Sequence, residues 1–328
     1  MRITNYTDLP EPIVNAIRQD YQSTPDRYSI TTIEQGVREV LLSRRYEDQL
    51  EMDAADGIWA LLGRLMHKVL EEAKETSSQL KEEFITLAFP YYKGKGFLAF
   101  GEIPNKDDIV ERVITVSGQF DLYDESSKEL TDYKLTSSWS YVFGGKAEWR
   151  KQLAGYAWMM KTLGFPVERG QNIIVYRDWN RGVMMRSKDY PRRACQVIKY
   201  EFRDQEFEAA YNNIIAKFAD ILKYENTPDD QLPVCTNEER WAKETTFAVM
   251  KKGRVKAMRV LKSEPAAVAY MAEKGGDEVV MRKGESTKCK HYCSCNHFCS
   301  FWKENYEAEE IAEEAAAQAL LAQPEGEE

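Results

Sequence analysis

Apolar residues recur at helical spacing in several stretches of the chain. The clearest pattern predicts a long helix over residues 54–76, with apolar positions at Ile58, Leu61, Leu62, Leu65, Val69 and Leu70. Similar patterns predict further helices at residues 33–45, 146–163 and 205–223.

Period-two alternation lies between these helices. Residues 112–123 put Thr115, Ser117, Gln119 and Asp121 on one face, and apolar residues on the other. A turn signal at residues 124–127 and a strand at residues 130–135 then complete an antiparallel hairpin. Other strands are expected at residues 84–89, 172–176 and 197–202. The resulting order, α-β-β-β-α-β-β-α, predicts an α/β protein.

The chain is long enough for about two domains. We expect a polar helical entry segment at residues 1–50 and a core at residues 51–227. A linker at residues 228–233 opens a C-terminal region at residues 228–303, which carries most of the cysteines. Residues 304–328 form a Glu/Ala-rich tail that is either helical or disordered.

Composition narrows the class of protein. No stretch approaches the ~20 apolar residues that a membrane helix needs, and the first residues lack the apolar core of a secretory signal. We therefore expect a cytoplasmic protein, not a membrane protein or a secreted disulfide scaffold. The net charge of −9 equals the nine glutamates of residues 304–328, so the rest of the chain is balanced. A local basic groove for nucleic acid is compatible with this total.

The hairpin carries the residues with the strongest chemistry. Asp132 and Lys134 are two positions apart on one strand, so both project to one face. Pairing with the preceding strand can bring Asp121 beside them. Two buried carboxylates would be costly unless they bind a cation, and oxygen ligands suit Mg²⁺ or Mn²⁺. Such a metal can activate water against a phosphodiester. Alone, however, an Asp-x-Lys pair is typical of an exposed ion pair.

Flanking motifs add to this pattern. Gly63-x-x-x-His67 lies on the long predicted helix and Gln152-x-x-x-Tyr156 on the helix after the hairpin, on either side of Gly118-x-x-Asp121 and Asp132-Tyr133-Lys134. Taken singly, a lone histidine is more often a core residue, the glycine can serve close packing, and the Gln/Tyr pair can lie at an ordinary packing boundary. The ordered set resembles the RecB-like exonuclease branch of the PD-(D/E)XK nuclease superfamily.

That resemblance implies a restriction-endonuclease-like core, a central mixed sheet flanked by helices. It further implies that His67, Asp121, Asp132 and the Tyr133 carbonyl bind Mg²⁺ or Mn²⁺. Lys134 would be the catalytic lysine. Gln152 and Tyr156 would position DNA or the attacking water.

Four cysteines crowd into eleven residues: Cys289, Cys293, Cys295 and Cys299. This density indicates zinc or an iron–sulfur cluster rather than disulfides. RecB-like nucleases with an iron–sulfur cluster end in a related run completed by a distant cysteine. By that resemblance we expect a [4Fe–4S] cluster on Cys235, Cys289, Cys293 and Cys299, although the distant cysteine in several such nucleases precedes the core. Alternatives are Cys295 or, more weakly, Cys195 as a ligand, and a zinc site completed by His291 and His297.

Candidate DNA contacts lie in two places. Trp139, Tyr141 and Phe143 follow Lys134 in a Ser/Gly-rich loop, where they either stack on unpaired bases or pack on the core. A basic run with Gly253 either touches phosphates as a hairpin or forms a solvated face; it contains Lys251, Lys252, Arg254, Lys256 and Arg259. Arg192 and Arg193 are weaker candidates, and the acidic tail is either inert or competes with DNA.

These features predict a metal-dependent DNA nuclease, most readily an exonuclease in phage or prophage recombination or DNA processing. In a phage its place would be the cytoplasm of the bacterial host, with DNA and a recombination protein as partners. Two alternatives remain. The same fold can act as a non-catalytic DNA- or protein-binding module organised by the metal or cluster. The chain can also be a redox or zinc-based interaction protein in which the carboxylates are incidental.

Overall fold

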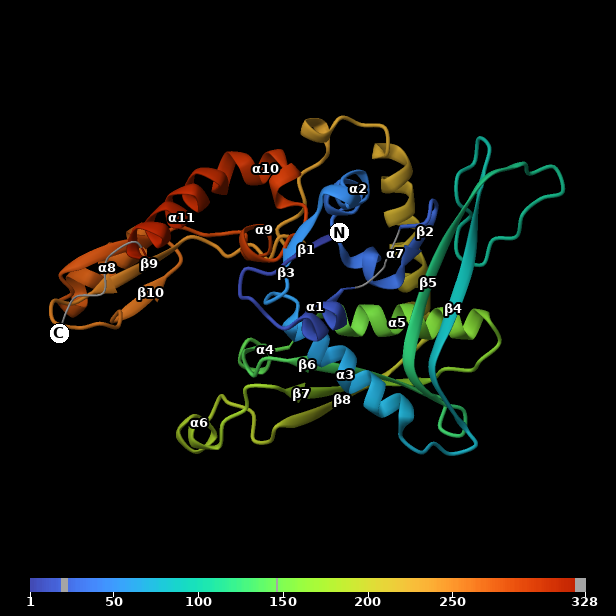
Figure 1. Ribbon diagram of the computed structural model, residues 1–328, viewed down its shortest axis with the longest axis horizontal. Helices are drawn as coiled ribbons and strands as arrows, with labels where there is room; N and C mark the ends of the chain where they lie inside the picture. Colours follow the sequence, from blue (N-terminus) through green and yellow to red (C-terminus); the bar gives the residue numbers. More distant parts are fainter. Residues whose placement is uncertain (19–22, 146, 322–328) are drawn as a thin grey trace. The chain divides into compact units, whose positions relative to one another are not determined.

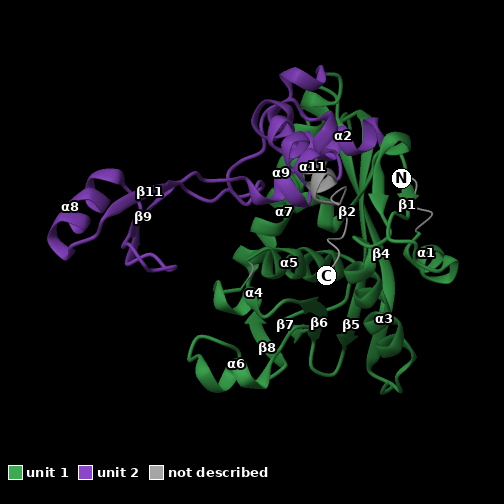
Figure 2. Ribbon diagram, turned by 60° about the vertical axis from the view of Figure 1, so that its left-hand side comes forward, with its two compact units in different colours: residues 1–35, 47–226 green, residues 36–46, 227–328 purple. Residues whose placement is uncertain are grey.

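The structure is a computed structural model that describes residues 1–18, 23–145 and 147–321 (Figure 1). The chain forms two compact units (Figure 2). The first contains residues 1–35 and 47–226, and the second contains residues 36–46 and 227–328. Part of the expected entry segment therefore belongs with the C-terminal region.

A mixed six-stranded sheet forms the centre of the first unit. Its strands are β2 (Arg27–Ser29), β4 (Gln79–Tyr92), β5 (Val110–Asp124), β6 (Glu129–Thr136), β7 (Arg169–Tyr176) and β8 (Cys195–Glu201). The order is β2-β5-β6-β7-β8, and β4 also pairs with β5. The β2–β5 and β6–β7 pairs are parallel and the others are antiparallel.

The two edges of the long strand β5 are paired differently, and we call the gap on its second edge, at residues 118–121, the fork. The first edge pairs with β4 over nearly the whole strand. The other edge pairs with β2 at residues 115–117 and with β6 at residues 122–124. Residues 118–121 lie between these two ladders. The fork matters because it leaves room for side chains to converge beside the sheet.

Helices flank this sheet, so the first unit is a mixed α/β structure. They are α3 (Ile58–Glu72), α5 (Ala147–Thr162) and α7 (Asp204–Tyr224). Helix α5 packs against β4, β6, β7 and α7. Phe89 anchors the core there, because its ring lies 5.7 Å from that of Trp158 and 5.3 Å from that of Phe218.

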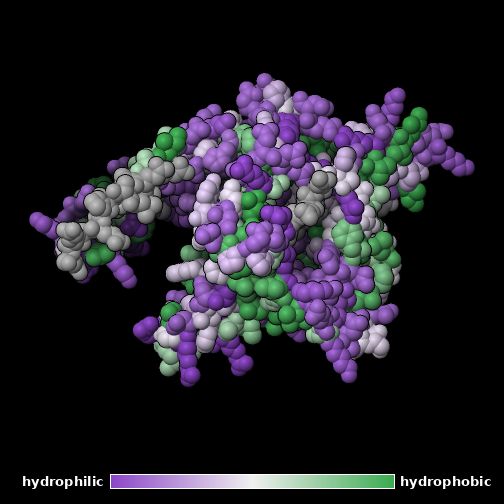
Figure 3. Space-filling view, in the orientation of Figure 1, coloured by the Kyte–Doolittle hydropathy of each residue, from purple (hydrophilic) through white to green (hydrophobic). Residues whose placement is uncertain are grey.

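Helix α3 contacts β6 but buries none of its side chains. Leu62, Leu65 and Val69 stay exposed on its outer face, and apolar surface is visible over this helix (Figure 3). It also packs on α1 (Glu11–Ile17), through a small core around Val14 and Ile17.

Smaller elements complete the first unit. The parallel pair β1 (Arg2–Thr4) and β3 (Glu51–Asp53) forms a separate two-stranded sheet. Two short helices, α4 (Trp139–Val142) and α6 (Arg181–Arg186), follow β6 and β7. Two short 3-10 helices, η1 (Ile30–Glu34) and η2 (Glu47–Gln49), also belong to this part of the chain.

The second unit combines α2 (Val37–Arg45) with the C-terminal part of the chain. An antiparallel sheet of order β10-β9-β11 pairs β9 (Thr246–Met250) with β10 (Arg259–Leu261) and β11 (Glu278–Arg282), and α8 (Glu264–Lys274) packs on it. The remaining elements are η3 (Asp229–Gln231), α9 (Thr287–His291), η4 (Asn296–Phe298), α10 (Ser300–Trp302), the π-helical η5 (Lys303–Glu307) and α11 (Ala308–Leu321).

The predicted order of long elements in the core is confirmed, with three corrections. The helix expected at residues 33–45 begins only at Val37, because Gly36 is extended. A Cβ on Gly36 would lie 2.4 Å from the Cys235 sulfur. The helix expected at residues 54–76 is shorter, and the strand expected at residues 84–89 is one part of the much longer β4. The strand was predicted too short because its first residues are mostly charged and show no alternation of apolar and polar positions.

The acidic tail is helical as far as Leu321, and residues 322–328 lie outside the described residues, as does Lys146 at the expected start of α5. Within the described ranges, no helix has both the length and the apolar character that crossing a bilayer requires.

Candidate functional site

The site is built around Asp121, the last residue of the fork. Its side chain is only 9% exposed, and its carboxylate accepts a hydrogen bond from the Tyr133 N–H at 2.5 Å. The side chain thus links β5 to β6 just beyond the last ladder pair, Leu122 with Thr131. This link brings Asp121 to the segment of β6 that carries Asp132 and Lys134.

Asp132 is buried, and both of its carboxylate oxygens have protein partners. One accepts from the Lys134 ammonium at 2.8 Å, and the other from the Asn172 amide at 2.7 Å. The Lys134 ammonium also donates to Gln152 on α5 at 2.9 Å. The lysine is therefore held between a carboxylate and an amide oxygen, with its charge directed into the site.

His67 approaches the same place from α3. Its Nδ1 lies 3.4 Å from an Asp121 oxygen and 3.3 Å from a Glu82 oxygen. Among the described residues, these three side chains are the one group of potential metal ligands whose donor atoms all lie within 4.8 Å of one another. A neutral imidazole with two carboxylates is a donor set that Mn²⁺ or Mg²⁺ can accept.

Glu82 was absent from the sequence-based prediction. It lies on β4 opposite Asp121, between the ladder pairs Lys81–Leu122 and Glu83–Phe120. Its φ of 51° is uncommon for a non-glycine residue, and its carbonyl accepts from the Gln119 amide at 2.7 Å. Extending the predicted strand two residues towards the N-terminus would have placed Glu82 beside the site.

The pKa values of all three carboxyl groups at the site are raised. Burial, and then the neighbouring Asp132, raise the pKa of Asp121 to about 7. Burial also raises the pKa of Asp132, although Lys134 opposes this, and burial raises the pKa of Glu82. Three carboxyl groups that resist ionisation together are what a divalent cation would relieve, so the residues present fit a metal ion.

Tyr156 on α5 packs directly against Gly118 at the edge of the site, where a larger residue than glycine would collide with its ring. A Cβ on Gly118 would lie 2.6 Å from the tyrosine ring. Burial, with the charges of Asp121 and Asp132, raises the pKa of the Tyr156 hydroxyl, so the group stays protonated. By contrast, a Cβ on Gly63 would meet no atom of the described residues within 4 Å, so nothing in that part of the chain requires a glycine here.

The geometry therefore gathers the four predicted motifs in one unit. His67, Asp121, Asp132 and Lys134 converge on the fork, and Gln152 contacts the lysine. Asn172 is a second residue missed from the sequence, although it is the polar start of an otherwise apolar predicted strand. Its Oδ1 is buried without a hydrogen-bond partner among the described residues.

The cysteines of the second unit form a separate cluster. Burial raises the pKa of the Cys289 thiol. The thiols of Cys293, Cys299 and the distant Cys235 raise that pKa further. Among the described residues, no three of these sulfurs lie within 4.8 Å of one another. Cys195 belongs instead to the first unit, where it is exposed at the start of β8.

Cys295 differs from the other four cysteines of this unit. It is 1% exposed and its sulfur donates to the Glu39 carbonyl of α2 at 3.7 Å, while lying 3.6 Å from the Cys293 sulfur. Helix α2 also supplies Arg38, which is buried and donates to the Cys299 sulfur at 3.6 Å. His297 packs its ring on Trp302 at 4.7 Å, and His291 is exposed on α9.

The candidate DNA contacts are exposed. Trp139 and Phe143 are 61% and 79% exposed, with their rings stacked 5.9 Å apart, whereas Tyr141 leans on Tyr176. These residues form the short helix α4 and its end, not the predicted loop. In the second unit, residues 251–258 connect β9 to β10 and carry Lys251, Lys252, Arg254 and Lys256, while Arg259 begins β10. Lys251 donates to the Gly275 carbonyl.

Comparisons with solved structures give distant likenesses. No protein-family model matches the chain, and no curated protein matches it. A crystal structure of SSO0001 aligns with a TM-score of 0.42 and 14% identity, covering 67% of this chain and 87% of that one. A phage-related exonuclease from Haemophilus somnus 129PT aligns with a TM-score of 0.24 and 13% identity, covering 66% of this chain and 82% of that one.

Proposed function

We propose that this protein is a metal-dependent DNA nuclease of the RecB-like PD-(D/E)XK type, and that it acts as an exonuclease. The observation that carries the proposal is the convergence of Asp121, Asp132 and Lys134 with Glu82 and His67 at the fork of β5 and β6. Glu82, which was not part of the motif set, adds a further carboxylate at the same place and so supports the proposal.

Glu82, Asp121 and His67 would hold a Mg²⁺ or Mn²⁺ ion, with Asp132 beside them. When bound, the ion lowers the pKa of a water molecule and stabilises charge on the phosphate. Lys134 places an ammonium where the negative charge develops, and the Asp132 and Gln152 contacts fix its direction. The Tyr133 carbonyl remains a candidate further ligand. Tyr156 would orient the attacking water or the DNA from α5.

A cleavage assay tests this function. Linear DNA should be degraded in Mn²⁺ by the natural protein and not by Asp121→Asn, and chelation should stop the reaction. Asp107→Asn is the matched control, because Asp107 is exposed on the β4–β5 connection. Equal degradation by the natural protein and Asp121→Asn would refute the site.

The form of the substrate tests the exonuclease assignment. End-labelled linear DNA should release short products, and covalently closed circular DNA should persist. Cutting of the circle would identify an endonuclease with the same site. Retention of DNA without metal-stimulated cleavage would favour the binding module instead.

In the second unit we propose a structural [4Fe–4S] cluster on Cys235, Cys289, Cys293 and Cys299, with zinc as the alternative. The electrostatic influence of Cys235, Cys293 and Cys299 on Cys289 supports these four thiols as the ligand set for either metal. The bond that Cys295 makes to a backbone carbonyl supports its exclusion from the ligand set.

Metal analysis of anaerobically purified protein tests this assignment. Cys235→Ser should lose its iron, and Cys295→Ser should keep it. A brown natural protein is expected, whereas a colourless one with stoichiometric zinc would identify the alternative. Iron lost from Cys295→Ser and retained by Cys235→Ser would reverse the ligand assignment.

A further inference from the structure

One end of the sheet in the first unit combines exposed aromatic rings with arginines. Strands β6 and β7 are parallel, so they end together at Thr136 and Tyr176. The chain continues from β6 into α4, and from β7 into a long excursion, residues 177–193, that contains α6. Both views place α4 and α6 near this end of the sheet (Figures 1 and 2). Lys134 is two residues from it.

The aromatic part of this surface is stacked but not covered. Trp139 and Phe143 present nearly parallel rings, at 23° to each other, to solvent. Buried packing does not explain two large apolar rings with this exposure. Flat, exposed rings are what unpaired bases stack on.

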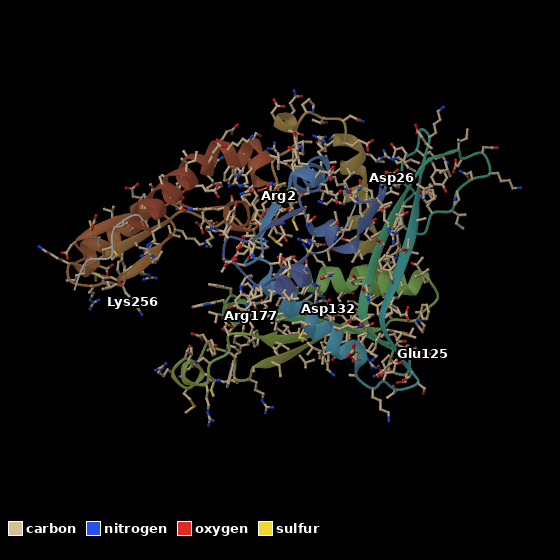
Figure 4. All side chains as sticks on the ribbon, viewed as in Figure 1. Arg2, Asp26, Glu125, Asp132, Arg177 and Lys256 are labelled. Carbon is tan, nitrogen blue, oxygen red and sulfur yellow. The ribbon has the colours of Figure 1, made fainter. Side chains whose placement is uncertain are left out.

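A second stacked pair lies at the same end. The guanidinium of Arg177 lies 4.0 Å from the ring centre of Trp59, which is 53% exposed at the start of α3. The Arg177 N–H donates to the Thr136 carbonyl, which ties this residue to the last residue of β6 (Arg177 is labelled in Figure 4). The arginine is therefore fixed beside the strand that carries Asp132 and Lys134.

The excursion adds cations without matching anions. It contains Arg177, Arg181, Arg186, Lys188, Arg192 and Arg193, against two aspartates. Within the described part of the chain, Arg181, Arg186 and Arg193 form no ion pair, and all three are exposed. Asp178 is already engaged, because its oxygens accept from Ser137 and Ser138 at 2.6 Å. An uncompensated basic segment suits a chain of phosphates.

We infer that the end of β6 and β7 is a binding platform for single-stranded nucleic acid, which leads the strand to the carboxylate site. Bases stack on Trp139 and Phe143, and phosphates lie along Arg177 and the excursion 177–193. The platform deepens the proposed function, because it names unpaired DNA as the form that the site receives.

Fluorescence anisotropy with a labelled oligothymidylate and a blunt duplex, both in chelator, tests the aromatic part. Trp139→Ala combined with Phe143→Ala should weaken oligothymidylate binding by roughly tenfold or more, the size expected for lost base stacking. Duplex binding should change much less. Tyr6→Ala is the matched control, since Tyr6 is an exposed ring on the N-terminal segment, 85% exposed. Unchanged oligothymidylate affinity, or an equal loss for both ligands, would overturn the inference.

Salt dependence tests the basic part. Replacing Arg181, Arg186 and Arg193 together with glutamine should reduce the slope of log affinity against log salt by about 2, as expected for three lost contacts on a single strand. Lys106→Gln, on the β4–β5 connection, should leave it unchanged. An unchanged slope in the triple variant would remove the excursion from the platform.

The two proposals can fail separately. Because binding is measured without metal, the platform does not depend on cleavage. Metal-dependent degradation by natural protein, together with normal binding by the platform variants, would refute the platform alone. Weakened binding by those variants, with no degradation by the natural protein, would refute the nuclease alone.

Discussion

Replacing Asp121 by asparagine should stabilise the metal-free protein while it abolishes cleavage. Burial beside Asp132 raises the pKa of Asp121 from 3.8 to about 7 in the folded chain. A carboxyl group whose folded pKa is raised costs stability as it ionises, and this cost appears as the pH rises from about 4 to about 7. Asparagine has the same shape, carries no charge, and can still accept the Tyr133 hydrogen bond.

The size of the effect follows from the shift. About three pKa units at 1.36 kcal/mol each correspond to up to about 4 kcal/mol at pH 8. At pH 5 the same comparison gives only about 1.5–2 kcal/mol, because the natural carboxyl is still mostly protonated in the folded state. The gain from Asp121→Asn should therefore grow between these two pH values.

Urea unfolding in chelator, followed by circular dichroism at pH 5 and pH 8, measures both differences. Asp107→Asn controls for the loss of a carboxylate at an exposed position. Adding Mn²⁺ at pH 8 should stabilise the natural protein more than Asp121→Asn, because the ion needs the charge. A variant no more stable than the natural protein at pH 8 would refute the account of the site as a strained cluster of carboxylates.

Two further substitutions test the ligand set and the closure of the site. Glu82→Gln should raise the Mn²⁺ concentration needed for half-maximal cleavage by at least about tenfold, which is the lower end of the effect of losing an indirect metal partner. Glu83→Gln is the control, because Glu83 is the exposed neighbour, and it should leave that concentration unchanged. Equal Mn²⁺ requirements for the two variants would exclude Glu82 as a ligand. Gly118→Ala should lower the free energy of unfolding by about 1–3 kcal/mol, because the new methyl group pushes Tyr156 aside. The displaced tyrosine should also lower the cleavage activity. Gly63→Ala should instead gain up to about 1 kcal/mol of helix stability, and a loss there comparable to that at Gly118 would contradict the packing described.

Periodicity predicted the core elements well because the strands and helices around the sheet bury one face each. Residues 112–123 and 130–135 alternate cleanly, so the hairpin and the position of Asp121 beside Asp132 could be anticipated. The motif residues were likewise identifiable, since each sits at a spacing that its element dictates.

Contacts between distant segments could not be predicted in this way. Glu82 lies among charged residues at the start of β4, where nothing alternates, and only the register with β5 places it opposite Asp121. Helix α2 presents a similar problem. Its amphipathic pattern predicts a helix, but no local signal says that Arg38 approaches a cysteine more than two hundred residues later.

The division of the second unit between residues 36–46 and 227–328 has a consequence for the newly made chain. Arg38 leaves the ribosome long before the carbonyls of Leu232 and Pro233 that accept its hydrogen bonds, by roughly 10–40 s at synthesis rates of about 5–20 residues per second. For most of that interval residues 47–226 of the first unit are still being synthesised, and α2 lacks its partners from the second unit. A ribosome that stalls, or a message cut short, before the cysteine segment would leave this helix without its cover and open to chaperones or proteases.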